Sequence, residues 1–280
     1  QQFKGWDPYD GLNSKVFKNS FLNNYEFSRL LWIQFFKLSP INLRKPFMIK
    51  KAYNPKGIAL LLSGYCNLYK LSKDNLIFGK ELEIKERINF LSSLLINLKS
   101  KGYSGSCWGY NFDWQARNKL YFPKNTPNIV TTSFCIDALN SVYELFGEKN
   151  ILNEIISSAY FVNNDLTKTK LKNGFFFSYS PLEGNNTVFN ASLMGAKILS
   201  YVYHHTNDET IKEVASDCIK TVCSFQKKDG SWSYGLLKIQ SWIDSFHTAY
   251  NLVSIKKFQE LTETKLFENV DSNLFNIDNN

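Results

Sequence analysis

A short segment rich in glycine and aromatic residues recurs three times along this chain of 280 residues. The copies are Gly105-Ser-Cys-Trp-Gly-Tyr-Asn-Phe-Asp-Trp114, Gly174-Phe-Phe-Phe-Ser-Tyr179 and Asp229-Gly-Ser-Trp-Ser-Tyr234. Each copy follows a stretch with amphipathic helical periodicity and precedes a more uniformly apolar one. A recurring supersecondary unit constrains the architecture more than any single residue does. Loops of this composition are also where a binding site is expected.

Helical periodicity fills most of the remaining sequence. Residues 80–99, 150–164 and 211–225 each carry a single apolar stripe, which is typical of a surface helix with one buried face. Residues 54–71 and 187–205 are apolar nearly all round, which predicts helices that are buried on all sides. Further helices are expected at residues 20–38, 129–146 and 243–261. Signals for strands are scarce.

The order of these patterns predicts the fold class. Amphipathic helices alternate with apolar ones, which describes an outer ring of helices around an inner ring. We therefore predict an all-α fold, an α/α toroid of helical hairpins. We count about four hairpins where a closed toroid of this kind has six, so an open arc or a shortened form is expected. A solenoid of stacked hairpins, in which these loops merely end helices, stays open as the alternative.

The domain organisation follows from the same patterns. We predict a single toroid domain over residues 1–265 and a polar, Asn/Asp-rich C-terminal tail over residues 266–280. No apolar run approaches the roughly 18–20 residues of a membrane span, so we predict no span.

The basic charge balance bears on the partners. The chain has 33 Lys and Arg against 25 Asp and Glu, giving a net charge of +8 and a pI of about 9.0. Because the lysines are scattered, a solvated surface is the simpler interpretation, and attraction to an acidic glycan is the functional one. No nucleic-acid-binding motif is present, so we predict no nucleic-acid partner. The sequence predicts no particular oligomeric state.

The five cysteines bear on the cellular compartment. Their number is odd, and no pair has Cys-x-x-Cys spacing. Cys66, Cys135, Cys218 and Cys223 fall within helical patterns and are expected to be buried thiols. A reducing compartment is therefore expected rather than a disulfide framework, and we predict a cytoplasmic protein.

The loops that precede the inner helices of a toroid line one mouth, where helix N-termini point N–H groups at a ligand. These loops supply aromatic planes that stack on sugar C–H faces, with carboxylate, amide and guanidinium groups that pair with hydroxyls. We therefore predict a carbohydrate ligand. The predicted substrate-binding residues are Asp7, Asp10, Trp108, Tyr110, Trp114, Arg117, Tyr179, Asn190 and Trp242, and Tyr234 is expected to face the same mouth.

The candidate catalytic residues are Asp113, Asp244, His247 and Tyr250. Asp244 and His247 are three residues apart, so on a helix they share a face and can act as a carboxylate-oriented base. Tyr250 lies three residues further along that face. Asp113 and Asp244, or Asp10 with either of them, could instead form the acid/base pair of a glycoside hydrolase, and the sequence does not give the separation of such a pair.

Each of these residues also has a structural interpretation. Trp108 and Trp232 could simply pack against the next hairpin. Asp113 could be a turn or cap residue, and Asp244 could be a helix N-cap. His247 could be a hydrogen-bonded core residue. These alternatives stay open at the level of sequence.

Metal and cofactor sites find no support in the sequence. His204 and His205 are adjacent and cannot share a helix face, and no Cys/His set has the spacing of metal ligands. P-loop, Gly-x-Gly-x-x-Gly and Gly-x-Ser-x-Gly motifs are absent. We therefore predict neither a metal nor a cofactor.

One repeat copy resembles a motif of known toroids. Gln226-Lys-Lys-Asp-Gly-Ser-Trp232 is similar to the Gln-x-x-Asp-Gly-Ser-Trp repeat of terpene cyclases and prenyltransferases. In those proteins the repeat fastens a helix to a loop, so the resemblance implies a fold and not an activity. The acidic motifs of terpene cyclases, DxDD and DDxxD, are absent, which argues against isoprenoid cyclisation.

A wider resemblance covers most of the chain. Five segments resemble, in the same order, bacterial polysaccharide-biosynthesis proteins of the VpsJ type, a family placed in the six-hairpin glycosidase-like superfamily. They are Trp6-Asp-Pro-Tyr-Asp-Gly-Leu-Asn-Ser14, Cys107-Trp-Gly-Tyr-Asn-Phe-Asp-Trp-Gln-Ala-Arg117, Phe177-Ser-Tyr-Ser-Pro181, Asn190-Ala-Ser-Leu-Met-Gly-Ala-Lys197 and Trp242-Ile-Asp-Ser-Phe-His-Thr-Ala-Tyr-Asn251. The resemblance implies an α/α toroid and a role in exopolysaccharide, capsule or O-antigen assembly, without implying a reaction. Members continue with further hairpins after the last segment, so the toroid is expected to be incomplete at the C-terminus.

Three functions are compatible with the sequence. The first is an enzyme that acts on a glycan or glycan precursor as a hydrolase, lyase or epimerase, with Arg117 pairing a uronate carboxylate where one is present. The second is a non-catalytic glycan-binding or assembly protein that uses the same aromatic mouth. The third is a scaffold that binds protein partners through its outer helices.

Overall fold

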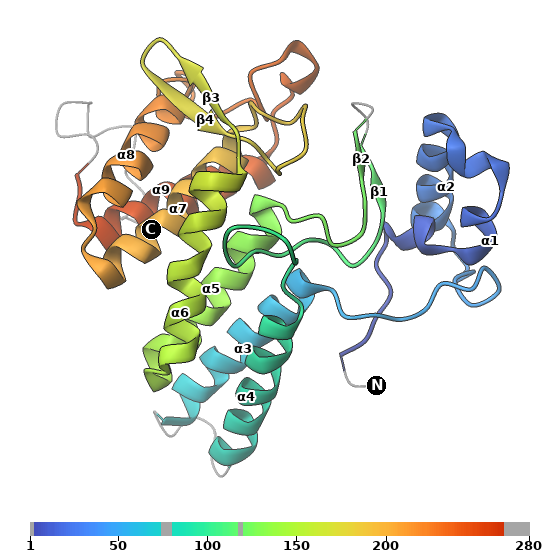
Figure 1. Cartoon of the computed structure of the whole chain (residues 1–280), viewed down its shortest axis with the longest axis horizontal. Helices are drawn as coiled ribbons and strands as arrows, with labels where there is room; N and C mark the ends of the chain where they lie inside the picture. The colour runs from blue at the N-terminus through green and yellow to red at the C-terminus, as the bar shows by residue number, and fades with distance from the viewer. Residues whose placement is uncertain (1–2, 74–79, 117–119, 266–280) are drawn as a thin grey trace. The chain divides into compact units, whose positions relative to one another are not determined.

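The computed structural model describes residues 3–73, 80–116 and 120–265 (Figure 1). Arg117 and the predicted tail at residues 266–280 lie outside the described residues. The described part is mostly helical, with two short β-hairpins. This confirms the predicted fold class of an all-α chain built from helical hairpins.

The chain divides into two compact units, residues 1–154 and residues 155–280. The first unit contains 3-10 helices η1 and η2, helices α1 to α5, strands β1 and β2, and the start of α6. Its elements are η1 (Asp10–Asn13), α1 (Lys15–Lys18), η2 (Phe21–Asn24), α2 (Glu26–Leu38), α3 (Pro55–Lys73), α4 (Glu81–Asn97), β1 (Trp114–Gln115), β2 (Tyr121–Phe122), α5 (Ile129–Phe146) and α6 (Lys149–Tyr160). The single domain predicted over residues 1–265 stays a prediction.

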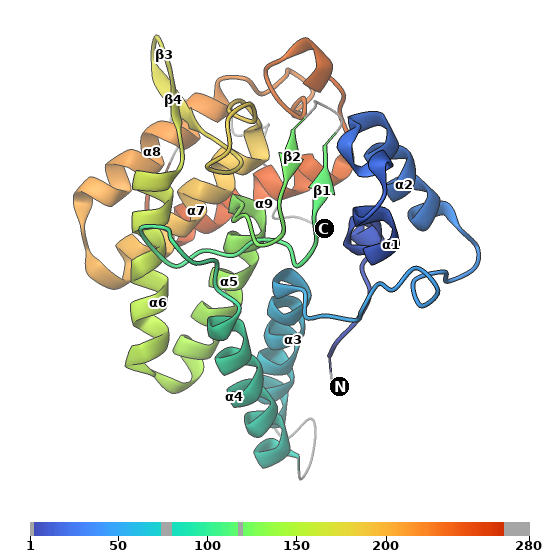
Figure 2. The ribbon, with the colours of Figure 1, turned by 45° about the vertical axis from the view of Figure 1, so that its right-hand side comes forward.

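The second unit begins within α6 and continues through a π-helical segment, η3. Its elements are η3 (Phe161–Asp165), β3 (Lys168–Leu171), β4 (Gly174–Phe177), α7 (Phe189–Thr206), α8 (Glu209–Cys223), η4 (Lys238–Gln240) and α9 (Ser245–Thr262). Antiparallel pairing joins β3 to β4, and β4 packs against α8. Helix α7 packs against both α8 and α9, which lie beside it in Figure 2.

Helix α7 is buried along most of its length, as its sequence predicts. Every residue from Phe189 to Val202 is buried, because α8 and α9 both pack on this helix. Helix α3 differs from the prediction that it is buried on all sides. It packs against α4 and α5, yet its exposed fractions reach 52% at Leu60, 41% at Leu61 and 40% at Leu68. The prediction for α3 is therefore wrong on this face, since its two neighbours cover only part of its circumference.

The glycine–aromatic repeat fastens helices to loops. The indole N–H of Trp108 donates to the carbonyl oxygen of Leu95 near the end of α4, at 2.7 Å. The indole N–H of Trp232 donates in the same way to Val222 near the end of α8, at 3.1 Å. Both tryptophan side chains are fully buried. This geometry fits the structural interpretation of both residues, and Trp108 offers no exposed surface to a substrate.

In each unit a glycine lies shortly after the buried tryptophan, at a point where its backbone approaches the backbone of another segment. A Cβ atom on Gly109 would stand 2.0 Å from the carbonyl oxygen of Thr126. A Cβ atom on Gly235 would stand 2.6 Å from the carbonyl oxygen of Thr187. Only glycine allows this approach. The two loops therefore share one structural device.

All five cysteines are free thiols. Four are buried, and Cys223 is only half-buried, which modifies the prediction for that residue. Burial raises the pKa of the Cys66 and Cys223 thiols to about 12. Within the described ranges, no helix combines the length and hydropathy that crossing a bilayer requires.

Candidate functional site

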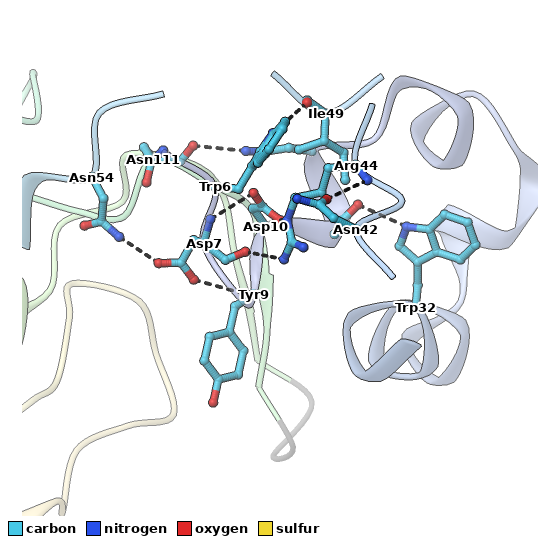
Figure 3. A network of polar contacts seen from close by, with 12 residues as sticks. Trp6, Asp7, Tyr9, Asp10, Trp32, Asn42, Arg44, Ile49, Asn54 and Asn111 are labelled. Atoms are coloured by element: carbon cyan, nitrogen blue, oxygen red, sulfur yellow. Dashed lines mark hydrogen bonds and ion pairs between the residues drawn. The ribbon is translucent and has the colours of Figure 1, made fainter. Parts of the chain in front are cut away.

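The loop at the start of the first unit is held by a buried ion pair (Figure 3). Nε of Arg44 lies 2.8 Å from Oδ1 of Asp10, and Nη2 of Arg44 donates to the main-chain oxygen of Asp7. Oδ2 of Asp10 accepts from the backbone N–H of Asp7. Burial raises the pKa of Asp10, and these donors only partly offset it. Asp10 therefore positions the loop, while its own carboxylate is buried.

Asp7 is only half-buried and borders a pocket. Its Oδ2 accepts from the side-chain amide of Asn54 at 2.9 Å, and its Oδ1 accepts from the backbone N–H of Tyr9 at 2.9 Å. Burial is the largest influence on this carboxyl and raises its pKa. The neighbouring pocket has a volume of about 240 Å³. The Asp7 carboxylate is therefore partly accessible, and its predicted role in substrate binding stays a prediction.

Asp113 is bound on both oxygens within the first unit. Its Oδ1 accepts from the backbone N–H of Lys124 at 2.7 Å, and its Oδ2 lies 2.5 Å from Nζ of Lys18. The carboxylate is buried and also accepts a hydrogen bond from Tyr121. Burial, followed by the charge of Asp113, raises the pKa of Tyr121 to about 12. These contacts match the structural interpretation of Asp113.

The other predicted residues of the first unit serve mainly in packing. The ring of Trp114 stacks on Phe122, with centroids 5.1 Å apart. The ring of Tyr110 stacks on Phe112 at 5.2 Å. Tyr110 and Trp114 are both half-buried rather than fully exposed.

The second unit brings together Tyr234, Trp242, Asp244 and His247. Asp244 is the N-cap of α9, and its Oδ1 accepts from the backbone N–H of His247 at 2.7 Å. The His247 ring turns back on the same carboxylate, with Nδ1 2.8 Å from Oδ2. The N-cap interpretation of Asp244 and its pairing with His247 are thus both present in the structure.

Two aromatic rings surround this pair. The rings of Tyr234 and Trp242 stack with centroids 4.4 Å apart at an interplanar angle of 11°. The His247 ring stands edge-on to both, with centroids 4.8 Å from Tyr234 and 5.2 Å from Trp242. Trp242 remains 45% exposed. The stack therefore presents an open aromatic surface next to the histidine.

The electrostatics fix the orientation of the histidine. Burial alone would raise the pKa of Asp244, but hydrogen bonds from the backbone and ring of His247 outweigh it and lower the pKa. An ionised carboxylate only accepts hydrogen bonds, so Nδ1 of His247 carries the proton. Nε2 has no hydrogen-bond partner in the described part of the chain. When the ring carries a single proton, on Nδ1, Nε2 has a lone pair, as a general base requires.

The remaining predicted residues of the second unit lie around α7 and α9. Tyr179 and Asn190 are buried, and Oδ1 of Asn190 has no hydrogen-bond partner among the described residues. Tyr250 lies on α9, where its ring contacts Phe246 with centroids 4.4 Å apart. Of the predicted site residues in this unit, the structure brings together Trp242, Asp244 and His247.

Other predictions keep their status. Asp113 belongs to the first unit and Asp244 to the second, so their pairing stays a prediction. The sequence analysis missed Asn54 and Asn111, although Asn54 precedes a helix-starting proline and Asn111 lies within the first repeat copy. No group of three or more His, Cys, Asp or Glu suited to a metal ion occurs among the described residues.

No protein-family model matches this sequence, and no curated protein matches it either. Two solved structures of the six-hairpin, α/α-toroid class are similar to it. The crystal structure of a D-mannose isomerase has 12% identity and a TM-score of 0.49, covering 91% of this chain and 70% of that one. A family 76 glycoside hydrolase from a bovine Bacteroides thetaiotaomicron strain has 12% identity and a TM-score of 0.47, covering 92% of this chain and 55% of that one. Likeness of this extent says nothing about chemistry, which has to come from this chain's own side chains.

Proposed function

We propose that this chain is a carbohydrate-active enzyme of surface polysaccharide biosynthesis in which His247 is the general base. The observation that carries this proposal is the Asp244–His247 pair, which leaves Nε2 open beside the exposed ring of Trp242. The resemblance of five sequence segments to polysaccharide-biosynthesis proteins supports the biological setting. The substrate is a glycan or a glycan precursor.

The arrangement suits removal of a proton from carbon. A sugar ring stacked on Trp242 would place its C–H bonds near His247, whose ring stands edge-on at 5.2 Å between centroids. Nε2 takes the proton, and the C–H electron pair moves onto an adjacent carbonyl or carboxylate as an enolate. Protonation of the enolate by a solvent water on the opposite face gives an epimer, and Nε2 then releases its proton to solvent. Expulsion of a β-oxygen substituent by the same electron pair gives an eliminated product.

Hydrolysis is less well served by these residues. Glycoside hydrolysis requires a carboxylic acid that keeps its proton near neutral pH, which calls for a raised pKa. Both oxygens of Asp244 instead accept hydrogen bonds from His247, and its pKa is lowered. We therefore favour epimerase or lyase chemistry over hydrolase chemistry.

The test is proton exchange in D₂O. The full chain is incubated with a panel of uronates, aldoses and acidic oligosaccharides, and loss of C–H signals is followed by ¹H NMR. We expect His247→Asn to lower the exchange rate by about 10²–10⁴-fold, the usual contribution of a general base. Trp242→Ala should raise KM more than it lowers kcat, because it removes the platform and leaves the base.

His204→Asn is the matched control. His204 lies in the last turn of α7, whereas His247 lies in the first turn of α9. It should exchange protons at the parent rate. Exchange that persists unchanged in His247→Asn would contradict the proposal. Saturable sugar binding that depends on Trp242 without any exchange would favour the non-catalytic glycan-binding alternative.

A further inference from the structure

The first unit contains a pocket that shares no lining residue with the proposed catalytic site. It opens beside Asp7, between the N-terminal loop and the first turn of α3, and has a volume of about 240 Å³. Pockets for drug-sized ligands have volumes of about 300–1,000 Å³, so this one suits a smaller molecule. Its lining includes Trp6, Asp7, Asn54, Gly57 and Asn111.

One lining residue carries a polar atom that lacks a partner. The Asn111 side chain is only 9% exposed, and its Oδ1 has no hydrogen-bond partner among the described residues. Leaving a buried acceptor unpaired destabilises the fold. Asp7 adds a carboxylate that has one donor on each oxygen, so each oxygen can accept a further bond. The Asp7 carboxylate therefore offers acceptors to a ligand in the pocket, and Asn111 adds a buried acceptor in the lining that still lacks a partner among the described residues.

The pocket is preorganised by contacts of its own lining. The indole N–H of Trp6 donates to the carbonyl oxygen of Ile49 at 3.0 Å, which fixes the ring. Gly5 pairs with Ala52 through two backbone hydrogen bonds. Asn54 caps α3 through Oδ1 while its amide holds Asp7 (Figure 3). A lining held in this way needs little ordering when a ligand binds.

The charges around the pocket select the ligand. Among the described lining residues there is no lysine or arginine. Burial raises the pKa of Asp7, and the charges of Arg44 and Lys56 only partly offset this effect. Nζ of Lys51 stands over the Trp6 ring at 4.8 Å, but none of these three cations lines the pocket. A phosphate or carboxylate inside the pocket would meet the carboxylate of Asp7 with no lysine or arginine in the described lining to pair with it. Hydroxyl groups, which can donate to both acceptors, meet no such obstacle.

We infer that this pocket binds a single ring of a neutral sugar. The ring lies beside Trp6, and its hydroxyls donate to the Asp7 carboxylate and to Oδ1 of Asn111. This site does not depend on catalysis by His247, and it gives the chain a second place to hold a glycan.

The experiment uses the full chain labelled with 5-fluorotryptophan. The chain has six tryptophans, and Trp6→Phe identifies the ¹⁹F signal of Trp6. Methyl glycosides of glucose, galactose and mannose serve as neutral probes, with glucuronate and glucose 6-phosphate as anionic comparators. We expect at least one neutral glycoside to shift the Trp6 signal saturably while both anions leave it unchanged.

Two glycines on α3 provide a matched pair of variants. Gly57 lines the pocket, and a Cβ there would make only an ordinary contact, 3.7 Å from Cβ of Asn54. Gly64 lies on the same helix, where a Cβ would meet nothing within 4 Å. Gly57→Leu should abolish the shift by filling the pocket, and Gly64→Leu should preserve it. Both changes replace a helical glycine, so their effects on the helix are comparable.

Polar substitutions complete the test. Asp7→Asn should weaken neutral-sugar binding by about tenfold or more, as expected for the loss of a charge-assisted hydrogen bond. His247→Asn should leave the Trp6 titration unchanged, which separates this site from the proposed catalytic one. The inference is overturned if no neutral glycoside shifts Trp6, if Gly57→Leu binds like the parent, or if the anions bind more tightly.

Discussion

The two units place an aspartate at their candidate sites in opposite environments. In the first unit, burial raises the pKa of Asp7, and its carboxylate borders a pocket. In the second unit, hydrogen bonds from His247 outweigh burial and lower the pKa of Asp244. The first carboxylate has one donor on each oxygen, whereas both oxygens of the second accept from His247. Our two proposals therefore give the same residue type different roles, recognition of a ligand by Asp7 and orientation of a base by Asp244.

The comparison is sharper because both units share the same structural device. Trp108 and Trp232 are buried in the same manner, and each indole bonds the end of the preceding helix. The difference between the two candidate sites therefore arises from residues other than these two tryptophans. In the second unit it arises at Trp242, which is exposed and stacked on Tyr234.

The largest effect is expected from removing these shared tryptophans. Trp108→Ala and Trp232→Ala should each lower the free energy of unfolding by about 3–5 kcal/mol, because each leaves a large cavity and an unpaired carbonyl. Trp242→Ala should cost much less, since its ring is 45% exposed. Chemical denaturation followed by circular dichroism measures all three.

Hydrogen exchange then tests the division into units. If the units have separate stabilities, Trp108→Ala should raise amide exchange mainly within residues 3–154, and Trp232→Ala mainly within residues 155–265. Equal acceleration throughout the described chain in both variants would instead favour the single domain that we predicted from the sequence.

Sequence patterns predicted the fold better than the site. Periodicity located every long helix, and α5 has the predicted bounds, because an apolar stripe or run directly reports which side packs. The extent to which each helix is buried was harder to predict. Helices α3 and α7 have similarly apolar sequences, but neighbouring helices cover α7 more completely than α3. Composition does not report how many helices pack on a given one.

For the site, local spacing was informative and composition was not. Asp244 and His247 could be paired from sequence because three residues on a helix fix their geometry. Asp113 and Trp108 are of residue types that often bind sugars, so the sequence alone could not separate them from binding residues. In the structure Asp113 pairs with Lys18, and Trp108 donates to the carbonyl oxygen of Leu95. The pocket beside Asp7 is lined by residues from three segments, 3–7, 52–61 and 111, which are far apart in the sequence. No local sequence pattern reveals that they meet.

A smaller effect is expected from the Asp244 carboxylate. Asp244→Ala should lower the free energy of unfolding by about 1 kcal/mol through loss of the helix cap. Asp244→Asn keeps a capping oxygen and should lose less, which isolates the contribution of the charge. Because the folded pKa is lowered, that charge contribution is present above the unfolded pKa of about 3.9 and is lost as pH falls through the folded pKa.

Urea denaturation between pH 7 and pH 3 measures this dependence. The deficit of Asp244→Asn should shrink as the pH falls below about 4. Asp208→Ala removes the N-cap of α8, which has no histidine partner, and provides the comparison for a cap alone. A deficit of Asp244→Asn that stays constant down to pH 3 would show that the charge of Asp244 contributes nothing.

The smallest effect, and the one with the opposite sign, is expected at Asp7. Burial is the largest influence on this carboxyl and raises its folded pKa, so the folded chain holds the proton more tightly than the unfolded chain does. Its ionised form therefore destabilises the fold, increasingly as pH rises from about 4 through the folded pKa. Asp7→Asn should be slightly more stable than the parent at pH 7 and equal to it near pH 3.

This gain is limited by the hydrogen bonds that the carboxylate now receives. An asparagine at position 7 has one acceptor oxygen for two donors, the Asn54 amide and the Tyr9 N–H, so part of the gain is lost. A variant that is more stable yet binds neutral sugars more weakly would show that Asp7 is kept for recognition at the expense of stability. An Asp7→Asn chain less stable than the parent at pH 7 would mean that hydrogen bonding outweighs desolvation, and the contrast with Asp244 would disappear.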